Sequence, residues 1–247
     1  MDFALIGYGK MGRIIEKIAA ERGHSVLVKI DPLIDSQNSA AKTLLQDVDA
    51  CIDFSHPDAV IDHIDLCASV GKPLVIGTTG WYEHLQAAEK KANQANIGVI
   101  WSANFSLGIN LFMHVVKESA KIFNPFTSYD VAGFEIHHEQ KIDSPSGTAK
   151  RLAETLLEEL TNKKKILYET VNRKVEKEEL QFTSLRVGHV PGTHTIYFDS
   201  PSDTITLTHT ARNRESFAEG AVIAAEWIVG KTGFFTIDDL MNQWNAQ

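Results

Sequence analysis

The first hundred residues alternate short apolar runs with amphipathic stretches, and this alternation constrains the fold more than any other feature of the sequence. The apolar runs have the length and composition of β-strands, and they lie at residues 3–6, 26–30, 50–54, 74–76 and 99–101. Between them, apolar residues recur at helical spacing, as at Ile14, Ile15 and Ile18, so helices can cover both faces of a sheet. Because strands that alternate with helices are typical of βαβ units, we predict an α/β domain with a Rossmann-type, doubly wound parallel sheet.

A glycine-rich loop follows the first predicted strand. Its residues are Gly7, Tyr8, Gly9, Lys10, Met11 and Gly12, and an amphipathic stretch follows them. Glycines allow a tight turn and the close approach of a pyrophosphate, which the amides and dipole of a helix N-terminus stabilise. A plain strand-to-helix turn is the alternative. The position of the loop favours dinucleotide binding, and we predict that all six residues contact a nicotinamide cofactor.

Two residues bear on the choice between NADH and NADPH. Asp31 closes the second predicted strand, where a carboxylate can bind the adenosine ribose hydroxyls and favour NADH. Lys10 can instead pair with the 2′-phosphate of NADPH. Pro32 follows Asp31, so an ordinary turn residue is the alternative for Asp31. We expect the chain to use either cofactor.

Two further segments follow predicted strands and therefore lie at the carboxyl edge of the sheet, where open α/β folds bind ligands. Gly77, Thr78, Thr79 and Gly80 follow the fourth strand, and we predict that the first three contact the nicotinamide ribose. The segment 53–57 ends the third strand. There we expect Ser55 to cap a helix that begins near Pro57.

The second half of the chain has a different pattern. A helix is predicted over residues 107–123, and period-2 alternation follows, as at Ile196, Phe198 and Leu207. We predict a smaller α+β domain with an open, mainly antiparallel sheet. The lysine run 163–165 and the charged stretch 173–179 are expected to be solvated. Because the last thirty residues are helical in pattern and can pack on the first domain, we expect a dinucleotide-binding domain of residues 1–105 completed by 214–247, and a substrate and oligomerisation domain of residues 106–213.

Composition excludes several classes of partner. The formal net charge is -8, which argues against binding to nucleic acid or to an anionic membrane, because both require a basic face. The two cysteines, Cys51 and Cys67, form no C-x-x-C pair and predict neither a disulfide framework nor a zinc site. The N-terminus lacks the features of a signal peptide, and no apolar stretch approaches a membrane span. We expect a cytoplasmic protein.

The segment 135–149 concentrates groups that suit an anionic substrate. His137 and His138 are adjacent, and on a strand they would point to opposite faces, so we expect no metal site. Lys141 adds a positive charge. The residues Ser146, Gly147 and Thr148 lead into a strongly helical run over 149–160, whose N-terminal amides can bind an anion. Together these groups predict a local positive pocket for a carboxylate, although a histidine pair is often structural.

This segment resembles the signature of the dihydrodipicolinate reductases, E-x-H-H-x-x-K-x-D-x-P-S-G-T-A, at every fixed position. The resemblance extends over nearly the whole chain. It includes the glycine loop, residues 77–80, Asn104 to Ser106 with Gly108 and Asn110, Arg186 with Gly188, Gly192 with His194, and residues 214–221. The chain departs from many members in its shorter glycine loop, where they have G-x-x-G-x-M-G, and this difference leaves the cofactor preference open.

The resemblance implies reduction of a small cyclic dicarboxylate, dihydrodipicolinate or its 4-hydroxy-tetrahydro precursor, by NADH or NADPH in lysine and diaminopimelate biosynthesis. It implies that His137 is the acid/base residue and Lys141 the proton donor. His138 would bind substrate, and Gly147 and Thr148, assisted by Ser146, would bind one carboxylate. The residues implied to line the nicotinamide and to mark the hinge between the domains are Ser102, Ala103, Asn104 and Phe105.

The resemblance also implies a homotetramer built through the open sheets of the second domain. Two alternatives remain at this point. One is another two-domain NAD(P)-dependent dehydrogenase, which would explain the glycine loop but not the whole of segment 137–149. The other is a non-catalytic NAD(H)-binding sensor, against which the presence of both His137 and Lys141 argues.

Overall fold

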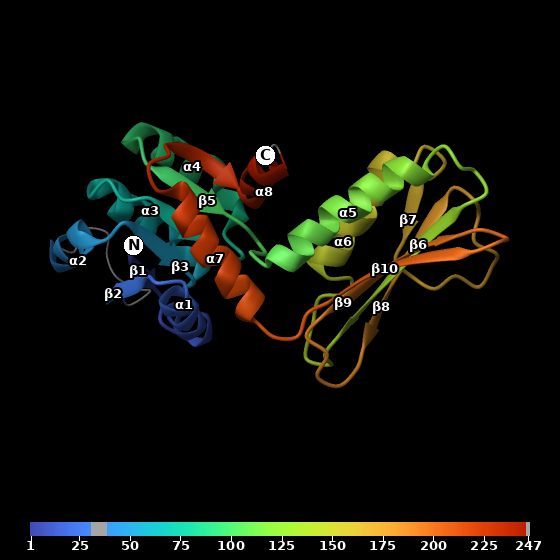
Figure 1. Cartoon of the computed structure of the whole chain (residues 1–247), viewed down its shortest axis with the longest axis horizontal. Coiled ribbons are helices and arrows are strands. Elements are labelled where there is room, and N and C mark those ends of the chain that lie inside the picture. The colour runs from blue at the N-terminus through green and yellow to red at the C-terminus, as the bar shows by residue number, and fades with distance from the viewer. Residues whose placement is uncertain (31–38, 246–247) are drawn as a thin grey trace. The chain divides into compact units, whose positions relative to one another are not determined.

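The computed structural model describes residues 1–30 and 39–245 and contains two compact units (Figure 1). The first unit comprises Met1–Asn110 and Arg214–Gln247, and the second comprises Leu111–Asn213. Asp31 lies outside the described residues, so its predicted contact with the adenosine ribose has no structural counterpart here. Within the described ranges, no helix has the length and apolar character needed to span a membrane.

The first unit contains a six-stranded sheet in which every neighbouring pair of strands is parallel. The strand order is β11-β5-β4-β3-β1-β2. The strands are β1 (Asp2–Ile6), β2 (Ser25–Ile30), β3 (Ala50–Asp53), β4 (Leu74–Ile76), β5 (Gly98–Trp101) and β11 (Gly233–Thr236). The predicted doubly wound sheet is confirmed, and the ends of its five predicted strands differ from the observed ones by one residue at most. Strand β11 was not predicted, because its four residues become a strand by pairing with β5.

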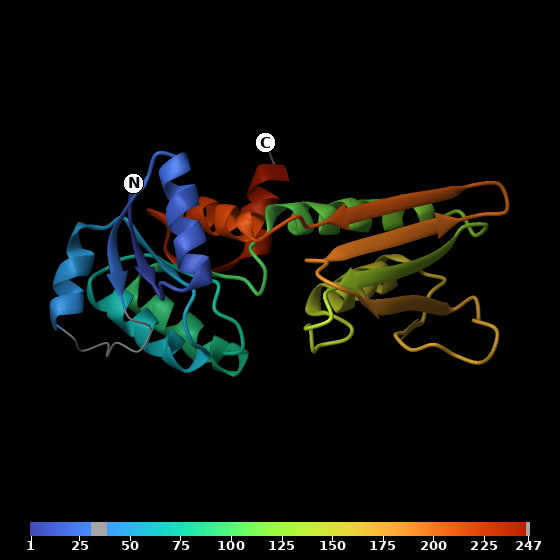
Figure 2. The same cartoon turned by 90° about the horizontal axis from the view of Figure 1, so that it is seen from below.

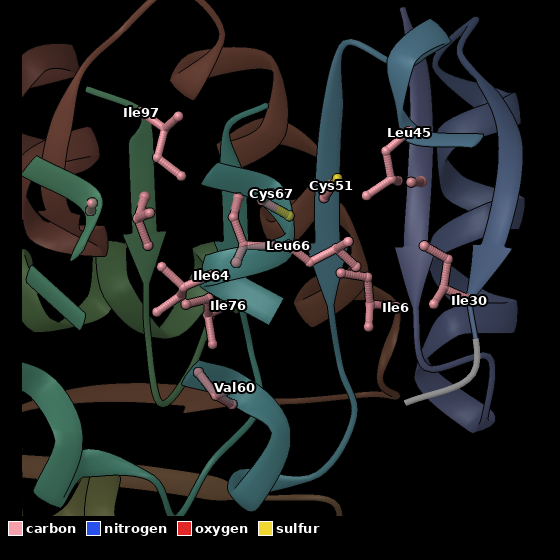
Figure 3. Packing of buried hydrophobic residues seen from close by; sticks show 14 of the residues in the cluster. Ile6, Ile30, Leu45, Cys51, Val60, Ile64, Leu66, Cys67, Ile76 and Ile97 are labelled. Carbon is pink, nitrogen blue, oxygen red and sulfur yellow. The ribbon is translucent and has the colours of Figure 1, made fainter. Parts of the chain in front are cut away.

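Helices cover both faces of this sheet. One face packs against α2 (Ser39–Leu44), α3 (Val60–Ser69) and α4 (Leu85–Ala95), and the other against α1 (Lys10–Glu21), α7 (Glu215–Ile228) and α8 (Ile237–Asn245). Short 3-10 helices occur at η1 (Leu45–Asp47), η2 (Pro57–Ala59) and η3 (Tyr82–His84). Figure 3 shows part of the first apolar layer, where Cys51 and Cys67 are buried free thiols. The C-terminal helices α7 and α8 pack on this unit.

The second unit contains a five-stranded sheet in the order β10-β9-β6-β8-β7. Its strands are β6 (Asp130–His137), β7 (Lys165–Leu167), β8 (Glu179–Arg186), β9 (Thr193–Asp199) and β10 (Thr204–Thr210). Helices α5 (Leu107–Phe123) and α6 (Gly147–Glu159) pack on one face, and Figure 2 shows them behind the strands. The predicted helix 107–123 is confirmed at both ends. The α6 prediction is confirmed except that the helix begins at Gly147 and ends at Glu159.

This sheet is mixed rather than mainly antiparallel. The pairs β9·β10 and β6·β9 are antiparallel, as the alternation of Ile196 and Phe198 led us to expect, whereas β6·β8 and β7·β8 are parallel. The parallel half follows from α6, which connects β6 to β7 as a crossover helix, and such a helix returns the chain in the same direction. Period-2 alternation reports which face a side chain occupies and carries no information about strand direction.

The expectation that the charged segments after α6 are solvated is wrong for Lys163 and Glu179, which are buried. Lys163 is buried, and its Nζ donates to Asp130 Oδ1 at 2.5 Å and to the carbonyls of Lys177 and Glu179. Arg173 donates to both carboxylate oxygens of Glu179, at 2.6 and 2.8 Å. These pairs fix the loop before β8. The lysine run in the sequence could not show the burial of Lys163, because its partners come from other segments.

The substitution Gly220→Ala tests the packing of α7 on the loop that follows β5. A Cβ at Gly220 would lie 1.8 Å from the carbonyl oxygen of Phe105. We expect this overpacking to lower the free energy of unfolding by about 1–3 kcal/mol, measured by urea denaturation with far-UV circular dichroism. In an uncrowded helix interior, alanine instead stabilises by about 1 kcal/mol over glycine, so the sign of the change is informative.

Glu219→Ala is the control for this substitution, because Glu219 is the exposed neighbour of Gly220 in the same helix. We expect it to change the free energy of unfolding by no more than about 0.5 kcal/mol. A Gly220→Ala variant at least as stable as the wild type would show that α7 does not approach Phe105 this closely.

Candidate functional site

The glycine loop joins β1 to α1 through Gly7, Tyr8 and Gly9, so Tyr8 carries the one side chain between the strand and the helix. Gly7 has φ +86°, and a Cβ there would lie 2.5 Å from the carbonyl oxygen of Phe54. A Cβ at Gly12 would lie 2.6 Å from the carbonyl oxygen of Gly7. Gly9 caps α1 without a side-chain hydrogen bond. The first amides of α1 therefore face an open backbone turn, which is the arrangement that binds a pyrophosphate.

The other loop residues surround the entrance to α1. Lys10, the first residue of the helix, is exposed, and Met11 is half-buried. The Tyr8 hydroxyl donates to Glu16, which also pairs with Lys29 at 2.7 Å. Hydrogen bonds from Lys29 and then from Tyr8 lower the pKa of Glu16. The Tyr8 ring is thereby held beside the loop by charged neighbours from α1 and β2.

A buried carboxylate joins the loops after β3 and β4. Asp53 accepts hydrogen bonds from the hydroxyls of Ser55, at 2.5 Å, and Thr78, at 2.9 Å, and it lies 2.8 Å from Nδ1 of His63. Thr78 also accepts a hydrogen bond from the amide of Ser55. The Thr78 hydroxyl therefore has internal partners, and the exposed side chain among the three predicted contacts is that of Thr79.

Two details of these loops differ from expectation or were not foreseen. Ser55 is not the N-cap of the following helix, because its hydroxyl binds Asp53, and the cap of η2 is His56. Gly77 lies so close to Phe54 that a Cβ would come 2.1 Å from the ring. The glycine at this position thus serves the packing of the loop on β3, in addition to any ligand contact.

The loop after β5 is ordered by its own polar groups. The Ser102 hydroxyl donates to the carbonyl of Asn104 and accepts from its amide, and the Asn104 side chain accepts from the amide of Ser106. Phe105 is buried, whereas Ala103 is exposed. The predicted nicotinamide residues therefore form one hydrogen-bonded turn at the carboxyl edge of the sheet.

In the second unit, Glu135 is fully buried under the helices, two residues before the end of β6. Its carboxylate accepts hydrogen bonds from the amide and hydroxyl of Ser146, from the Ser184 hydroxyl at 2.9 Å and from Arg186 Nη2 at 3.1 Å. Burial alone would raise the pKa of Glu135, but the imidazoles and hydrogen-bond donors around it hold the pKa well below its usual range. The side chain is therefore an anion.

Two histidines lie against this carboxylate. His137 Nδ1 is 3.2 Å from Glu135 Oε2, and His194 Nε2 is 3.5 Å from the same oxygen. The two rings meet edge to face with centroids 5.2 Å apart. Among the described residues, these nitrogens have no partner in good hydrogen-bond geometry. His138 follows the end of β6 and is half-buried, so His137 is the one of the pair that adjoins the carboxylate.

His194 and the neighbouring His209 were not assigned a role from the sequence. They are directly paired across β9 and β10, and burial lowers the pKa of both, with the Glu135 carboxylate opposing the shift at His194. The signal that could have found Glu135 is alternation, because Glu135 and His137 lie two residues apart on a strand and therefore share one face. Gly192 also supports the site, since a Cβ there would lie 2.9 Å from His137 Nε2.

Lys141 lies in the loop between β6 and α6, which Arg186 holds at two points. The Lys141 ammonium donates to Asp143 Oδ1 at 2.7 Å. Arg186 donates to the main-chain carbonyls of Lys141, at 3.3 Å, and of Asp143, at 2.5 Å. The loop is thus attached to the last residue of β8.

The N-terminus of α6 is positioned by the same carboxylate. Ser146 is the N-cap, and its hydroxyl accepts from the amide of Ala149 at 3.1 Å while it donates to Glu135. The amides of Gly147 and Thr148, the first two residues of the helix, have no intrahelical acceptor. They remain available to an anion, so the structure brings His137, Lys141 and the open end of α6 together around Glu135.

The donor types of this cluster also suit a metal ion. One carboxylate oxygen of Glu135 and one ring nitrogen each from His137 and His194 lie within 4.8 Å of one another. However, the carboxylate already has the Arg186 guanidinium and Ser146 as partners, and a divalent ion would have to compete with that positive charge. The expectation of no metal site remains a prediction.

Comparisons with known proteins agree over nearly the whole chain. A family model described as dihydrodipicolinate reductase, N-terminus, matches residues 1–105, and one described as dihydrodipicolinate reductase, C-terminus, matches residues 108–241. A 4-hydroxy-tetrahydrodipicolinate reductase of Christiangramia forsetii is 38% identical over 98% of both chains. One of Caldanaerobacter subterraneus is 34% identical over 95% of both chains. A solved structure, a dipicolinate-bound dihydrodipicolinate reductase from Paenisporosarcina, shares the fold with a TM-score of 0.76 and 22% identity, over 97% of this chain and 98% of that one.

The lowered pKa of His194 predicts how stability changes with pH. Because burial lowers the pKa of this imidazole in the folded state, the unfolded chain binds more protons below the ordinary histidine pKa of about 6.5. The free energy of unfolding should therefore fall as the pH drops from 7.5 through 6.5 towards the lower, folded pKa. The groups that face His194 are Glu135, His137, His209 and Lys141.

Urea denaturation at pH 7.5 and pH 5.5 checks this prediction. We expect the loss of stability between the two values to be smaller in His194→Asn than in the wild type. His84→Asn is the control, because His84 lies on the surface of the first unit. Equal losses in all three proteins would show that His194 is not held neutral by burial.

Proposed function

The chain belongs to the dihydrodipicolinate reductase family, and we propose that its two units each hold one reactant. The enzyme is an NAD(P)H-dependent oxidoreductase that reduces 4-hydroxy-tetrahydrodipicolinate or dihydrodipicolinate, cyclic dicarboxylates, to tetrahydrodipicolinate in lysine and diaminopimelate biosynthesis. In the proposal, residues 1–105 with 214–247 bind the cofactor, and residues 106–213 bind the substrate.

The cofactor is assigned to the carboxyl edge of the parallel sheet. The glycine loop from Gly7 to Gly12 would hold the pyrophosphate on the amides of α1, and the loops at Gly77 to Thr79 and at Ser102 to Phe105 would hold the nicotinamide ribose and ring. When bound, the nicotinamide supplies the hydride. We propose that NADH and NADPH both serve, because Lys10 is exposed at the start of α1 and can meet a 2′-phosphate, while Asp31 suits a free ribose.

The observation that supports the substrate site is the gathering of three groups around Glu135. His137 lies 3.2 Å from the carboxylate, Lys141 is in the loop held by Arg186, and α6 begins at the cap Ser146. One substrate carboxylate would bind the amides of Gly147 and Thr148 with help from Ser146 and the dipole of α6. His138, half-buried at the start of the same loop, would contact the substrate as well.

His137 and Lys141 are assigned the proton chemistry. Lys141 would donate the proton that the reduced ring requires, and its positive charge would stabilise negative charge that develops there. His137 would act as the acid/base group, with Glu135 holding its ring. Family membership contradicts the alternative of another two-domain NAD(P)-dependent dehydrogenase. The alternative of a cofactor-binding sensor without turnover is settled by measuring turnover.

We further propose a cytoplasmic homotetramer. The face of the second sheet away from α5 and α6 carries Phe134 stacked with Tyr197, half-buried Ile136, and Leu185 with 54% of its surface exposed. An apolar face of this kind is typical of an interface between subunits. The buried free thiols Cys51 and Cys67 are compatible with a reducing compartment.

Replacement of the two proton-handling residues tests the reaction. We expect His137→Gln and Lys141→Ala each to lower kcat by about 10²- to 10⁴-fold, the usual contribution of a general acid or base. The assay follows NAD(P)H absorbance with substrate generated freshly from pyruvate and aspartate semialdehyde by the preceding synthase.

The controls for this assay are His84→Gln and Lys164→Ala, which remove a surface histidine and a surface lysine outside the candidate site. Both should keep wild-type turnover. A folded wild type that binds the nucleotide but does not oxidise it with substrate would contradict the assignment and favour the sensor.

Substitution on the open sheet face tests the assembly. We expect Leu185→Glu to convert tetramers to smaller species, because a charge at an apolar interface is desolvated without a partner. Leu44→Glu is a matched control, since Leu44 is also 54% exposed but lies on α2 of the first unit. Sedimentation velocity measures both. A monomeric wild type, or an unchanged Leu185→Glu tetramer, would contradict the proposed interface.

A further inference from the structure

We propose that Glu135 and Arg186 form a positioning pair that fixes the Lys141 loop and the N-terminus of α6 relative to His137. Neither residue would contact the substrate. Their function would be to hold three separate segments in the arrangement that the reaction needs. This inference deepens the proposed function and rests on the roles given there to Lys141 and α6.

Arg186 is the attachment point of the loop. Its guanidinium donates to the carbonyls of Lys141 and Asp143, to the carbonyl of Leu185 and to Glu135 Oε1. These contacts occupy four of its five N–H groups. The side chain is 19% exposed. Arg186 therefore acts as a clamp on the main chain of the loop and has little capacity left to bind a substrate carboxylate.

Glu135 completes the link to the helix. Oε1 accepts from Arg186, from the Ser184 hydroxyl and from the amide of Ser146, and Oε2 accepts from the Ser146 hydroxyl and faces His137. The cap of α6 and the clamp of the loop thus meet on one carboxylate. Displacement of this carboxylate would move the Lys141 ammonium and the Gly147 amide together.

The ion pair between Glu135 and Arg186 is better explained by the segments that it positions than by a contribution to the stability of the fold. A buried ion pair contributes little net stability, because the loss of hydration offsets the attraction between the charges. Apolar residues of similar volume would serve the core equally well. What apolar residues could not do is hold the main-chain carbonyls of residues 141 and 143, since only a planar fork of donors reaches several acceptors at once.

Strand β8 provides a matched control at its other end. Glu179, its first residue, forms a two-pronged pair with Arg173, and it also accepts from the amide of Glu176. This pair has the same chemistry and also fastens a loop to β8. The loop it fastens contains none of the proposed site residues, so its loss reports the general effect of breaking an ion pair in this sheet.

The first test is steady-state kinetics of Arg186→Lys. We expect kcat/KM for the cyclic substrate to fall by about tenfold to a hundredfold, as misplacement of a reacting group by about 1 Å does. KM for the nicotinamide cofactor should stay within twofold of the wild type, because the proposed cofactor residues belong to the other unit. Arg173→Lys should leave both values unchanged. Unchanged kinetics in Arg186→Lys, or equal losses in both variants, would overturn the proposal.

The second test needs no turnover. Amide hydrogen exchange at Ser146, whose N–H binds Glu135, and at Lys141 reports the order of the loop directly. We expect exchange at both amides to be at least tenfold faster in Arg186→Lys and in Glu135→Gln, and unchanged in Arg173→Lys. Exchange at wild-type rates in the first two variants would overturn the positioning role even in an active enzyme. Faster exchange in a protein that lacks turnover would uphold the positioning role and reject the proposed function alone.

Discussion

The buried carboxylate of Glu135 is the constraint on which the second unit depends. An anion removed from water requires compensation by hydrogen bonds and positive charge, and here the compensating groups come from β6, β8, β9 and the start of α6. Strands β6 and β8 must therefore end beside this carboxylate, and β9 and α6 must begin beside it. The same requirement that keeps the anion in the core also gathers the groups that can act on a substrate.

The first unit uses the same device. Asp53, at the end of β3, is fully buried and is compensated by Ser55, Thr78 and His63. These contacts join the loops after β3 and β4, which adjoin the glycine turn after β1. Loops at the carboxyl edge of a parallel sheet are otherwise independent of one another, and a shared carboxylate gives them one fixed arrangement.

The sequence predicts the frame of this protein better than its polar interior. The glycine loop and the five strands of the first unit follow from local periodicity and turn chemistry, and they agree with the structure to within one residue. Glu135 and Asp53 stood inside motifs that were noticed, but their burial depends on which distant segments supply donors, and no local pattern contains that information. For the same reason Lys163 was expected in solvent, and β11 was not expected at all.

The mixed direction of the second sheet explains why one edge carries the whole candidate site. Strands β6 and β8 are parallel, so His137 and Arg186, their last residues, are direct neighbours in the register. Strand β9 runs the other way and brings His194 opposite Glu135 near its start. In a fully antiparallel sheet, β8 would end at the far edge and Arg186 could not reach the Lys141 loop. The crossover through α6, which makes β8 parallel to β6, also places the start of α6 directly after that loop. The topology that the alternation pattern could not reveal is therefore the feature that assembles the site.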